Sequence, residues 1–328
     1  MEIHCIGRYE RRPRCVFWRS FGPHDAPLSL RLVRKCFSAA LLILGAAFAL
    51  MAQPHLPIDA LYGAQDSFCK IGTSEGERAA FLSALTDDGI IFRPAAIKGM
   101  QFWRDNLEPW PTTLDRGISF ADVSSNGLLG YTTGMWKSSQ KLDGKPVERA
   151  GEYVTVWERR DGGGFRAVLD ITTRHDDIDK VLSNGGGRAA TLDQNARGWS
   201  ATNDAYKFLR TSMQGGGLAA ALNALSMDDV RLLIDDEPPV IGKKNAVEAA
   251  KLYTAMGFPE NVAIYQSGDM AYFWNQCRYQ NNTEGIERGN CLQVMKLREK
   301  KWWLVLAVFA RLDDEKPPVL ASSPKHKK

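Results

Sequence analysis

One sequence pattern occurs twice along this chain. The helix end AAFLSALTDD, from Ala79 to Asp88, returns as AAALNALSMD, from Ala219 to Asp228. An apolar strand-like run follows each copy and leads to proline, at Pro94 in the first copy and at Pro238-Pro239 in the second. A pattern repeated at this spacing is one structural unit used twice. The sequence therefore predicts two domains of one kind.

The repeat continues downstream through strand-like segments. These are 126–136 with 267–275, 151–157 with 289–295, and 165–171 with 302–309. Helices are expected over 58–71, 75–85 and 100–106 in the first copy, and over 203–213, 218–225 and 245–255 in the second. Helices followed by a run of strands favour an α+β fold with mostly antiparallel sheets.

The expected bounds are 57–180 for the first domain and 201–312 for the second. A linker is expected over 183–200, where Gly185, Gly186 and Gly187 interrupt any periodic pattern. Residues 313–328 have the charged and proline-rich composition of a disordered tail. A length of 328 residues suits two such domains.

Residues 1–52 have the pattern of a basic leader that ends in a signal peptide. Arg31, Arg34 and Lys35 precede the uncharged run Cys36–Met51, which ends among small residues. These 16 residues are fewer than a spanning helix needs, which is about 20. We expect an exported protein, periplasmic or extracellular, with no stable membrane insertion after processing. The alternative is a chain anchored by an uncleaved signal.

The formal net charge of +4 belongs to this leader. Residues 1–52 hold eight Lys and Arg against three Asp and Glu, which leaves 34 basic and 35 acidic residues elsewhere. Phosphate binding needs a clustered basic face, and the only cluster outside the leader is the short tail Lys325–Lys328. We therefore expect no nucleic-acid partner.

Three cysteines follow the leader: Cys69, Cys277 and Cys291. The last two flank the polar turn 281–290 of an expected hairpin, where opposed residues come within disulfide range. A disulfide between Cys277 and Cys291 is one alternative. Two buried free thiols are the other, because a register shift of one residue places them on opposite faces.

The first copy resembles the nuclear transport factor 2-like superfamily, near its SnoaL-like and ketosteroid-isomerase-like bacterial domains of unknown function. The matching features are Asp87-Asp88, the strand Ile90–Pro94, the Gly99 turn, the hairpin 122–136 and the strand pair 151–171. The resemblance covers 57–175 well and 201–312 more loosely. It implies two cone-shaped domains, in each of which helices pack on a curved sheet around an internal pocket. It leaves the function open, since this fold serves enzymes, small-molecule binders and protein contacts alike.

The resemblance also implies where a catalytic base would lie. An isomerase of this superfamily uses an aspartate just after the first strand, and that position holds Arg93, which does not release a proton at neutral pH. In the second copy, Asp235 and Asp236 lie near the corresponding place. They are either a functional pair of carboxylates or solvated acids at a strand end.

Strand alternation suggests a partner for Arg93. Asp170 shares strand parity with Arg166 and Val168, and if that side faces inward, Asp170 and Arg93 meet as a ligand anchor or as a structural ion pair. The neighbouring strand 151–157 is apolar on both faces. We therefore expect its outer face to be covered by pairing of the two domains within the chain, or by a homodimer.

A set of mainly aromatic residues is the candidate ligand pocket. It is either a packed core with sheet cover, or a pocket for an apolar or planar small molecule. The candidates are Arg93, Trp103, Tyr131, Trp136, Tyr153, Trp157 and Asp170 in the first domain, and Asp235, Tyr272 and Trp274 in the second. Neither domain can assemble a histidine metal site, because His175 is the one histidine within them. No cofactor motif is present, so we expect none.

Three hypotheses follow. The first is an exported binding protein without catalysis, and it is favoured because Arg93 occupies the position of the base. The second is a SnoaL-like or isomerase-like enzyme that uses Asp170 in one copy and Asp235 or Asp236 in the other. The third is an oligomerisation scaffold whose two interiors are filled by side chains.

Overall fold

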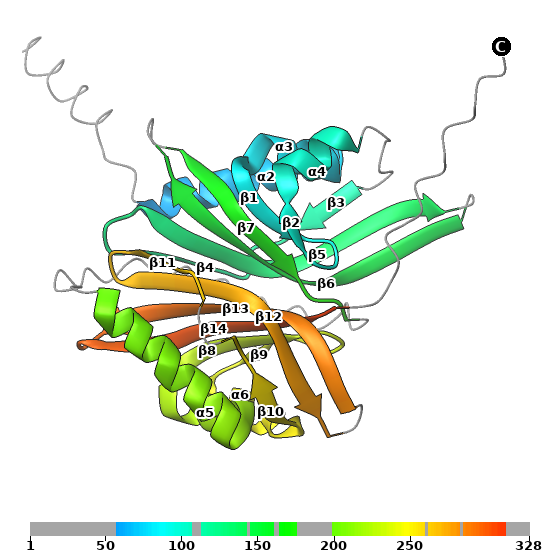
Figure 1. Ribbon diagram of the computed structural model, residues 1–328. Coiled ribbons are helices and arrows are strands. Elements are labelled where there is room, and N and C mark those ends of the chain that lie inside the picture. Colours follow the sequence, from blue (N-terminus) through cyan, green and yellow to red (C-terminus); the bar gives the residue numbers. More distant parts are fainter. Residues whose placement is uncertain are drawn as a thin grey trace, which may run out of the picture. The chain divides into compact units, whose positions relative to one another are not determined.

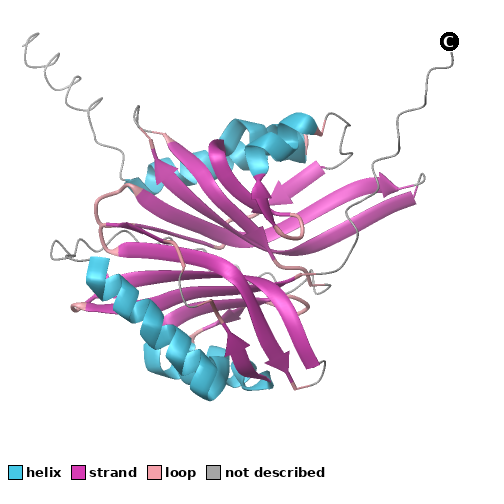
Figure 2. Cartoon of the chain, viewed as in Figure 1, coloured by secondary structure: helices cyan, strands magenta, loops and turns pink. Residues whose placement is uncertain are grey.

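The computed structural model describes residues 57–106, 113–142, 145–160, 164–175, 199–259, 262–282 and 285–312. Within these ranges the chain forms two halves, each with helices packed on a seven-stranded sheet (Figures 1 and 2). The predicted leader 1–52 and tail 313–328 lie outside the described residues, as does the predicted linker up to residue 198. Trp199 and Ser200, assigned to that linker, instead begin a helix.

The first half begins with two helices and a short strand pair. Its helices are α2 (Pro57–Ser74), α3 (Glu77–Ala84) and α4 (Gly99–Asp105). Its strands are β1 (Leu85–Phe92), β2 (Ala96–Lys98), β3 (Thr113–Arg116), β4 (Phe120–Val123), β5 (Leu129–Leu142), β6 (Lys145–Arg159) and β7 (Phe165–Thr172). The long strands β5, β6 and β7 form an antiparallel meander, and β1 joins β7 in parallel.

The second half repeats this order. Its helices are α5 (Trp199–Leu225), α6 (Lys243–Ala249) and the 3-10 helix η1 (Ala250–Leu252). Its strands are β8 (Ser226–Ile234), β9 (Val240–Ile241), β10 (Tyr253–Gly257), β11 (Ile264–Ser267), β12 (Met270–Asn281), β13 (Gly285–Arg298) and β14 (Lys301–Arg311).

The two sheets have the same strand order. The first runs β2-β1-β7-β6-β5-β3 with β4 on β5, and the second runs β9-β8-β14-β13-β12-β10 with β11 on β12. Even an irregularity is shared, because the pairing of β6 with β7 skips Val168 and that of β13 with β14 skips Val305. A β-bulge in the same place of both sheets gives a reliable register for comparing the halves residue by residue.

Helix α5 corresponds to α2 and α3 together. It is broken at Gly217, whose φ of 72° is not helical. A Cβ atom at this position would lie 2.7 Å from the Tyr253 carbonyl oxygen. The sequence prediction of two helices, over 203–213 and 218–225, matches the parts on either side of this break.

Each half has its own core between helices and sheet. The first core contains Phe68, Phe81, Trp103, Tyr153 and Trp157 among others. The second core contains Leu209, Leu222, Phe273, Met295 and Phe309 among others. Because β6 and β13 alternate, their remaining apolar side chains point to the opposite face of each sheet.

Those opposite faces share one apolar cluster, which we call the interface cluster. Val154 and Val156 of β6 pack in it with Leu292 and Val294 of β13. Phe92 and Trp274 add an edge-to-face ring contact with centroids 5.6 Å apart. The two halves belong to a single compact unit.

A buried ammonium group also joins the halves. The side chain of Lys296, on β13, has no exposed area and lies 3.4 Å from Asp122 Oδ1 and 3.3 Å from Asp269 Oδ2. Its Nζ also donates to the Val123 carbonyl oxygen at 3.0 Å. Burial raises the pKa of Asp122 above its ordinary value, against the lowering effect of Lys296. Lys296 thus bridges one carboxylate from each half.

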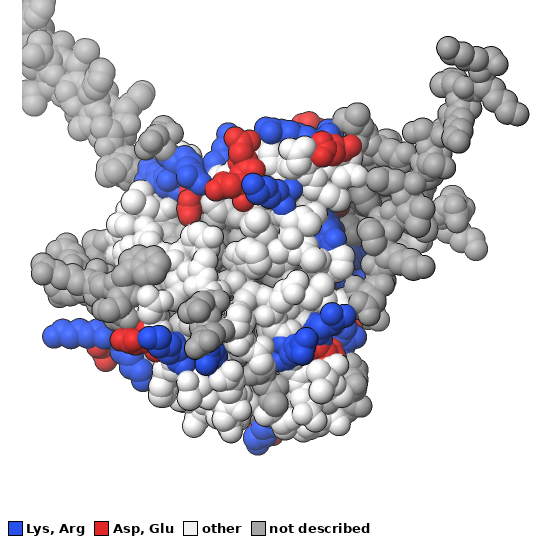
Figure 3. Space-filling model, in the orientation of Figure 1, with Lys and Arg blue, Asp and Glu red and all other residues white. Residues whose placement is uncertain are grey.

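The structure confirms the α+β prediction and corrects two local details. The helix predicted over 245–255 ends early, because β10 begins at Tyr253. The short strands β2 and β3 and their counterparts β9 and β10 were not predicted, whereas β4 and β5 form the predicted hairpin 122–136. On the face in Figure 3, basic and acidic side chains lie close together, between broad areas of uncharged residues.

Candidate functional site

The most polar feature of the first core is an arginine that the sequence analysis missed. Arg116, at the end of β3, forms a two-pronged ion pair with Asp170 of β7. Its Nη1 lies 2.7 Å from Asp170 Oδ2 and its Nη2 lies 3.0 Å from Oδ1. The hydroxyl of Thr155 also donates to Asp170 Oδ2 at 2.6 Å. Asp170 is therefore held on both oxygens.

Aromatic rings surround this ion pair. The Arg116 guanidinium lies over the rings of Phe68, Phe81 and Tyr153, at 4.7, 5.5 and 4.5 Å from their centroids. Burial opposes the charge, but Asp170 outweighs it and the pKa of Arg116 lies above its ordinary value. A cation in this setting gains from both the carboxylate and the ring faces. The pair fills the middle of the first core.

The predicted meeting of Asp170 with Arg93 is wrong. Arg93 instead pairs with Glu77 and lies 5.5 Å from the Trp103 ring centroid, with 39% of its side chain exposed. Asp170 is opposite Ile91, and Arg93 lies beyond the end of β1, where it reaches α3. A bulge at Val168 also reverses strand parity between Arg166 and Asp170. Arg166 consequently faces outward while Asp170 faces the core.

Four of the predicted aromatic residues are fixed in the first core. Trp103 stacks on Phe81 with centroids 5.4 Å apart. Trp136 Nε1 donates to the Thr173 carbonyl oxygen at 3.0 Å, and Trp157 Nε1 donates to Thr132 Oγ1 at 2.9 Å. Tyr153 is fully buried beneath Arg116. These side chains mostly fill the core rather than line a pocket.

Three other candidates lie on the opposite sheet faces. Tyr131 and Tyr272 belong to the interface cluster, and Trp274 packs against it. Their assignment to ligand pockets inside the two domains is corrected by this placement. The alternation of β5 and β12 explains it, since Thr132 and Phe273 take the inward positions.

A cavity of about 300 Å³ lies at the edge of the first core. Helix α2 contributes Gly63, Ala64 and Phe68, and the sheet contributes Trp157 and Phe165. The remaining lining residues are Ala60, Ser67, Ser83, Ala84, Gly164 and Arg166. Trp157 is the one predicted pocket residue among them. The volume is at the lower end of the range for small-molecule sites, and the lining is mainly apolar.

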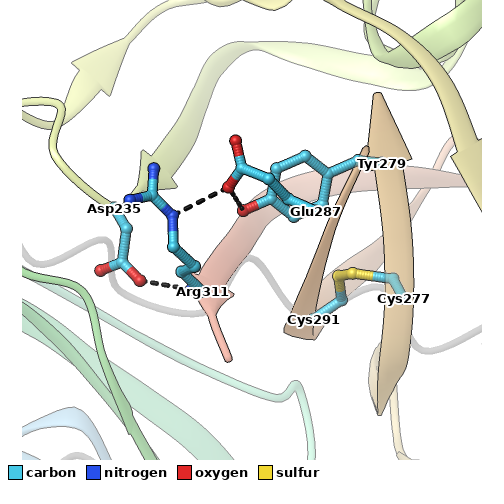
Figure 4. Close-up of a disulfide and its surroundings, with 6 residues drawn as sticks. All are labelled: Asp235, Cys277, Tyr279, Glu287, Cys291 and Arg311. Carbon is cyan, nitrogen blue, oxygen red and sulfur yellow. Dashed lines mark hydrogen bonds and ion pairs between the residues drawn. A yellow bond between two sulfur atoms is a disulfide. The ribbon is translucent and has the colours of Figure 1, made fainter. Parts of the chain in front are cut away.

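The second half contains a disulfide between Cys277 of β12 and Cys291 of β13, with Cα atoms 6.1 Å apart (Figure 4). The two residues are diagonal neighbours, because Cys277 opposes Gly289 and Cys291 opposes Asn275. Next to them, Tyr279 donates to Glu287, which also accepts from Arg311 Nε at 2.8 Å.

Asp235 lies where the two halves meet. One carboxylate oxygen accepts from the Arg174 backbone N–H at 2.7 Å. The other accepts from the backbone N–H of Arg311 (Figure 4). Burial raises the pKa of Asp235 to about 6, against the lowering effect of these hydrogen bonds. Asp236 is more exposed and pairs with Arg311. A cavity of about 260 Å³ adjoins them, with Glu148, Arg149 and Arg174 in its lining.

Two kinds of site are absent from the described part of the chain. These residues contain no group of three or more His, Cys, Asp and Glu side chains that could hold a metal ion. They also contain no helix long and apolar enough to span a membrane.

Comparison with known proteins finds likeness in structure alone. No protein-family profile and no curated protein sequence matches the chain. An NTF2-like protein from Cytophaga hutchinsonii is 18% identical and covers 34% of this chain and 97% of its own, with a TM-score of 0.30. A ketosteroid isomerase-like protein from Erwinia carotovora atroseptica is 16% identical over 34% and 95%, with a TM-score of 0.28.

A third neighbour is a conserved protein from Planctomyces limnophilus. It is 15% identical over 37% of this chain and 99% of its own, with a TM-score of 0.31. At these identities and TM-scores the neighbours carry no argument about activity, ligand or partner. The order of helices and strands in each half agrees with the α+β arrangement predicted from the sequence.

Proposed function

We propose that this chain is a binding protein for a small apolar molecule, which occupies the 300 Å³ cavity of the first half. That cavity is the observation that carries the proposal. Phe68, Trp157 and Phe165 offer ring surface, and the small residues of α2 leave the space open. A ligand without charge suits these walls, because they are mainly apolar and the guanidinium of Arg166, the one charged group among the described lining residues, already donates to the Ser83 carbonyl oxygen.

Binding is favoured over acid–base catalysis by the state of the candidate carboxylates. Asp170 is held by Arg116 and Thr155. Both oxygens of Asp235 accept backbone hydrogen bonds. A general base needs a lone pair directed at its substrate. Neither aspartate lines the apolar cavity of the first half, so neither is placed to take a proton from a ligand held there.

A space-filling substitution tests the cavity. A Cβ atom built on Gly63 would meet nothing within 4 Å, so Gly63→Leu projects into open space without a backbone clash. The probe is 1-fluoronaphthalene, with binding followed by the line width of its fluorine resonance. We expect the wild-type protein to bind the probe and Gly63→Leu to bind at least about ten-fold more weakly, since the added side chain takes up the volume.

Gly63→Ala is the matched control. It keeps the cavity and should keep the affinity, while replacing a mid-helix glycine stabilises the fold by roughly 0.5–1 kcal/mol. Equal binding by wild type and Gly63→Leu would overturn the proposal, as would absence of binding to the wild type.

We further propose that the chain is exported and that its leader is removed. The apolar run Cys36–Met51 and the disulfide in the second half support this, because disulfides persist in oxidising compartments. Mass spectrometry of the protein expressed in a bacterium should find it in the periplasm or medium without residues 1–52. A full-length product retained in the cytoplasm would contradict export.

A further inference from the structure

Two buried amides in the second half have no hydrogen-bond partner. Gln293 is 0% exposed and Asn275 is 6% exposed. Neither the nitrogen nor the oxygen of either side chain is bonded within the described residues. Buried polar groups in native proteins are nearly always paired, with protein, water or ligand. Leaving one unpaired costs about 1–3 kcal/mol.

The two amides are neighbours on one face. Gln293 shares the parity of Cys291 and Met295 on β13, and Asn275 shares that of Phe273 and Cys277 on β12. Those four residues belong to the second core. Asn275 opposes Cys291 and Gln293 opposes Phe273, so the amides have the same diagonal relation as the two bonded cysteines, whose Cα atoms are 6.1 Å apart. Together they present two donor groups and two acceptor oxygens to the second core.

The first half shows which groups pair with the residue that is equivalent to Gln293. When the two sheets are aligned at their shared bulge, Gln293 is equivalent to Thr155 and Ala307 is equivalent to Asp170. Phe258, which continues the register of β10 opposite Cys277, takes the place of Arg116. Apolar residues thus replace both partners of the ion pair. The residue opposite Gln293 is an alanine, which lacks the carboxylate that Asp170 offers to Thr155 in the first half.

Asn275 takes the place of a glycine. In the first half this position is Gly134, where a Cβ atom would lie 1.9 Å from the Gly117 carbonyl oxygen. A side chain cannot be accommodated there. At Asn275 a complete amide side chain is accommodated. No backbone therefore lies as close to the sheet here as the Gly117 carbonyl does to Gly134 in the first half.

The surroundings define the chemistry of an occupant. The buried charged residues of the second half all contact the first half instead, namely Arg231, Asp235, Asp269 and Lys296. Apolar residues make up the remaining core cluster around the amides. The Glu287 carboxylate reaches Tyr279 of this core, but it is already paired with Arg311. A neutral molecule with both a donor and an acceptor would satisfy both amides.

We propose that Asn275 and Gln293 form a second ligand site, for a small neutral molecule that carries a donor and an acceptor together, such as an amide or lactam. This site is separate from the apolar cavity of the first half. It requires no covalent step, since recognition rests on hydrogen bonds formed in an apolar setting.

Three matched probes test the proposal by fluorine NMR: 4-fluorobenzamide, 4-fluorobenzoate and 4-fluorotoluene. The full chain should bind the amide at least about ten-fold more tightly than the other two, because only the amide is both neutral and hydrogen-bonding. Gly63→Leu, which fills the cavity of the first half, should leave this preference unchanged. Failure of the first-half proposal is thereby distinguished from failure of this one.

The variant Asn275→Leu with Gln293→Met removes both amides while keeping side-chain volume. It should lose the amide preference and melt at the same temperature or higher, because buried unpaired groups are replaced by apolar ones. Gln293→Thr, which installs the residue found at position 155, provides a milder second variant and should also weaken amide binding. Undiminished amide binding by both variants would overturn the proposal. Equal binding of the three probes by the wild type, or no binding, would overturn it too.

Discussion

The two cores occupy equivalent positions in one fold and are built from opposite chemistry. The first holds Arg116 and Asp170 as a buried ion pair beneath aromatic rings. The second has Phe258 and Ala307 in those places. Where the first has the diagonal pair Trp136 and Tyr153, the second has the disulfide cysteines.

This difference shows that the same fold accepts different side-chain chemistry in its core. Strand order, bulge and helix placement are common to both halves, so they do not depend on the ion pair or on the disulfide. Each half has its own cross-link. In the first half an ion pair joins β3 to β7 across the two strands between them, and in the second half a disulfide joins the neighbouring strands β12 and β13. The side chains of a core can therefore diverge after duplication while the pattern of apolar residues preserves the arrangement of strands and helices.

The largest expected effect comes from removing one charge in the first core. Arg116→Met leaves the Asp170 carboxylate buried without its partner, and breaking such a pair costs roughly 3–5 kcal/mol. Urea denaturation should show the loss as a lower midpoint. The double variant Arg116→Phe with Asp170→Ala, which copies the second core, should recover at least half of it. A double variant as unstable as the single would mean that the charges are not the cause.

The disulfide should contribute less. Cys277 and Cys291 are 14 residues apart, and a loop of this size stabilises by about 3 kcal/mol in the chain-entropy account. Replacing both by alanine should lower the unfolding free energy by this amount, and a reducing agent should lower that of the wild type similarly. Cys69→Ser is the control and should change little, because that thiol is not in a disulfide and a hydroxyl can still accept the hydrogen bond from Gln65 Nε2. Wild-type stability that does not respond to reduction would contradict the pairing.

The smallest effect depends on pH and concerns the contact between the halves. Asp235 has its pKa raised to about 6, above the ordinary value for an aspartate. Its contribution is fully present below about pH 4 and is lost as the pH rises through 6, by about 2–3 kcal/mol. The stability advantage of wild type over Asp235→Asn should therefore shrink between pH 4 and pH 7.

Asp236→Asn is the matched control for that experiment. Asp236 has a φ of 66°, a conformation that asparagine adopts readily, and its side chain is largely exposed. Its stability should follow that of the wild type across the same pH range. A constant difference between wild type and Asp235→Asn would show that Asp235 does not titrate with folding.

Most of the fold could be predicted from the sequence, because both copies repeat the same spacing of apolar residues and the same turns. The sequence did not predict β3, a strand of four residues after a proline-rich stretch, and with it Arg116 was missed. One signal was present, since Leu114 and Arg116 share parity in TLDR and the structure buries both.

Site residues were harder to predict than strands for a physical reason. The bulge at Val168 places Arg166 and Asp170 on opposite faces of the sheet, and no residue type at that position indicates it. Tyr131, Tyr272 and Trp274 were misplaced because both faces of these sheets are apolar, so composition does not tell inner from outer. Asn275 and Gln293, the two amides of the second core, gave no signal in the sequence beyond being polar residues within apolar strands.

Lys296 makes the association of the halves selective. It sits opposite Met270, and the equivalent position opposite Leu129 is Glu158. If two first halves from different chains paired in the same way, Asp122 would face Glu158, and two like charges would replace an attraction. Apolar residues of the interface cluster would fit either partner equally well. The buried ammonium thus favours the pairing of a first half with a second half and disfavours the pairing of two first halves.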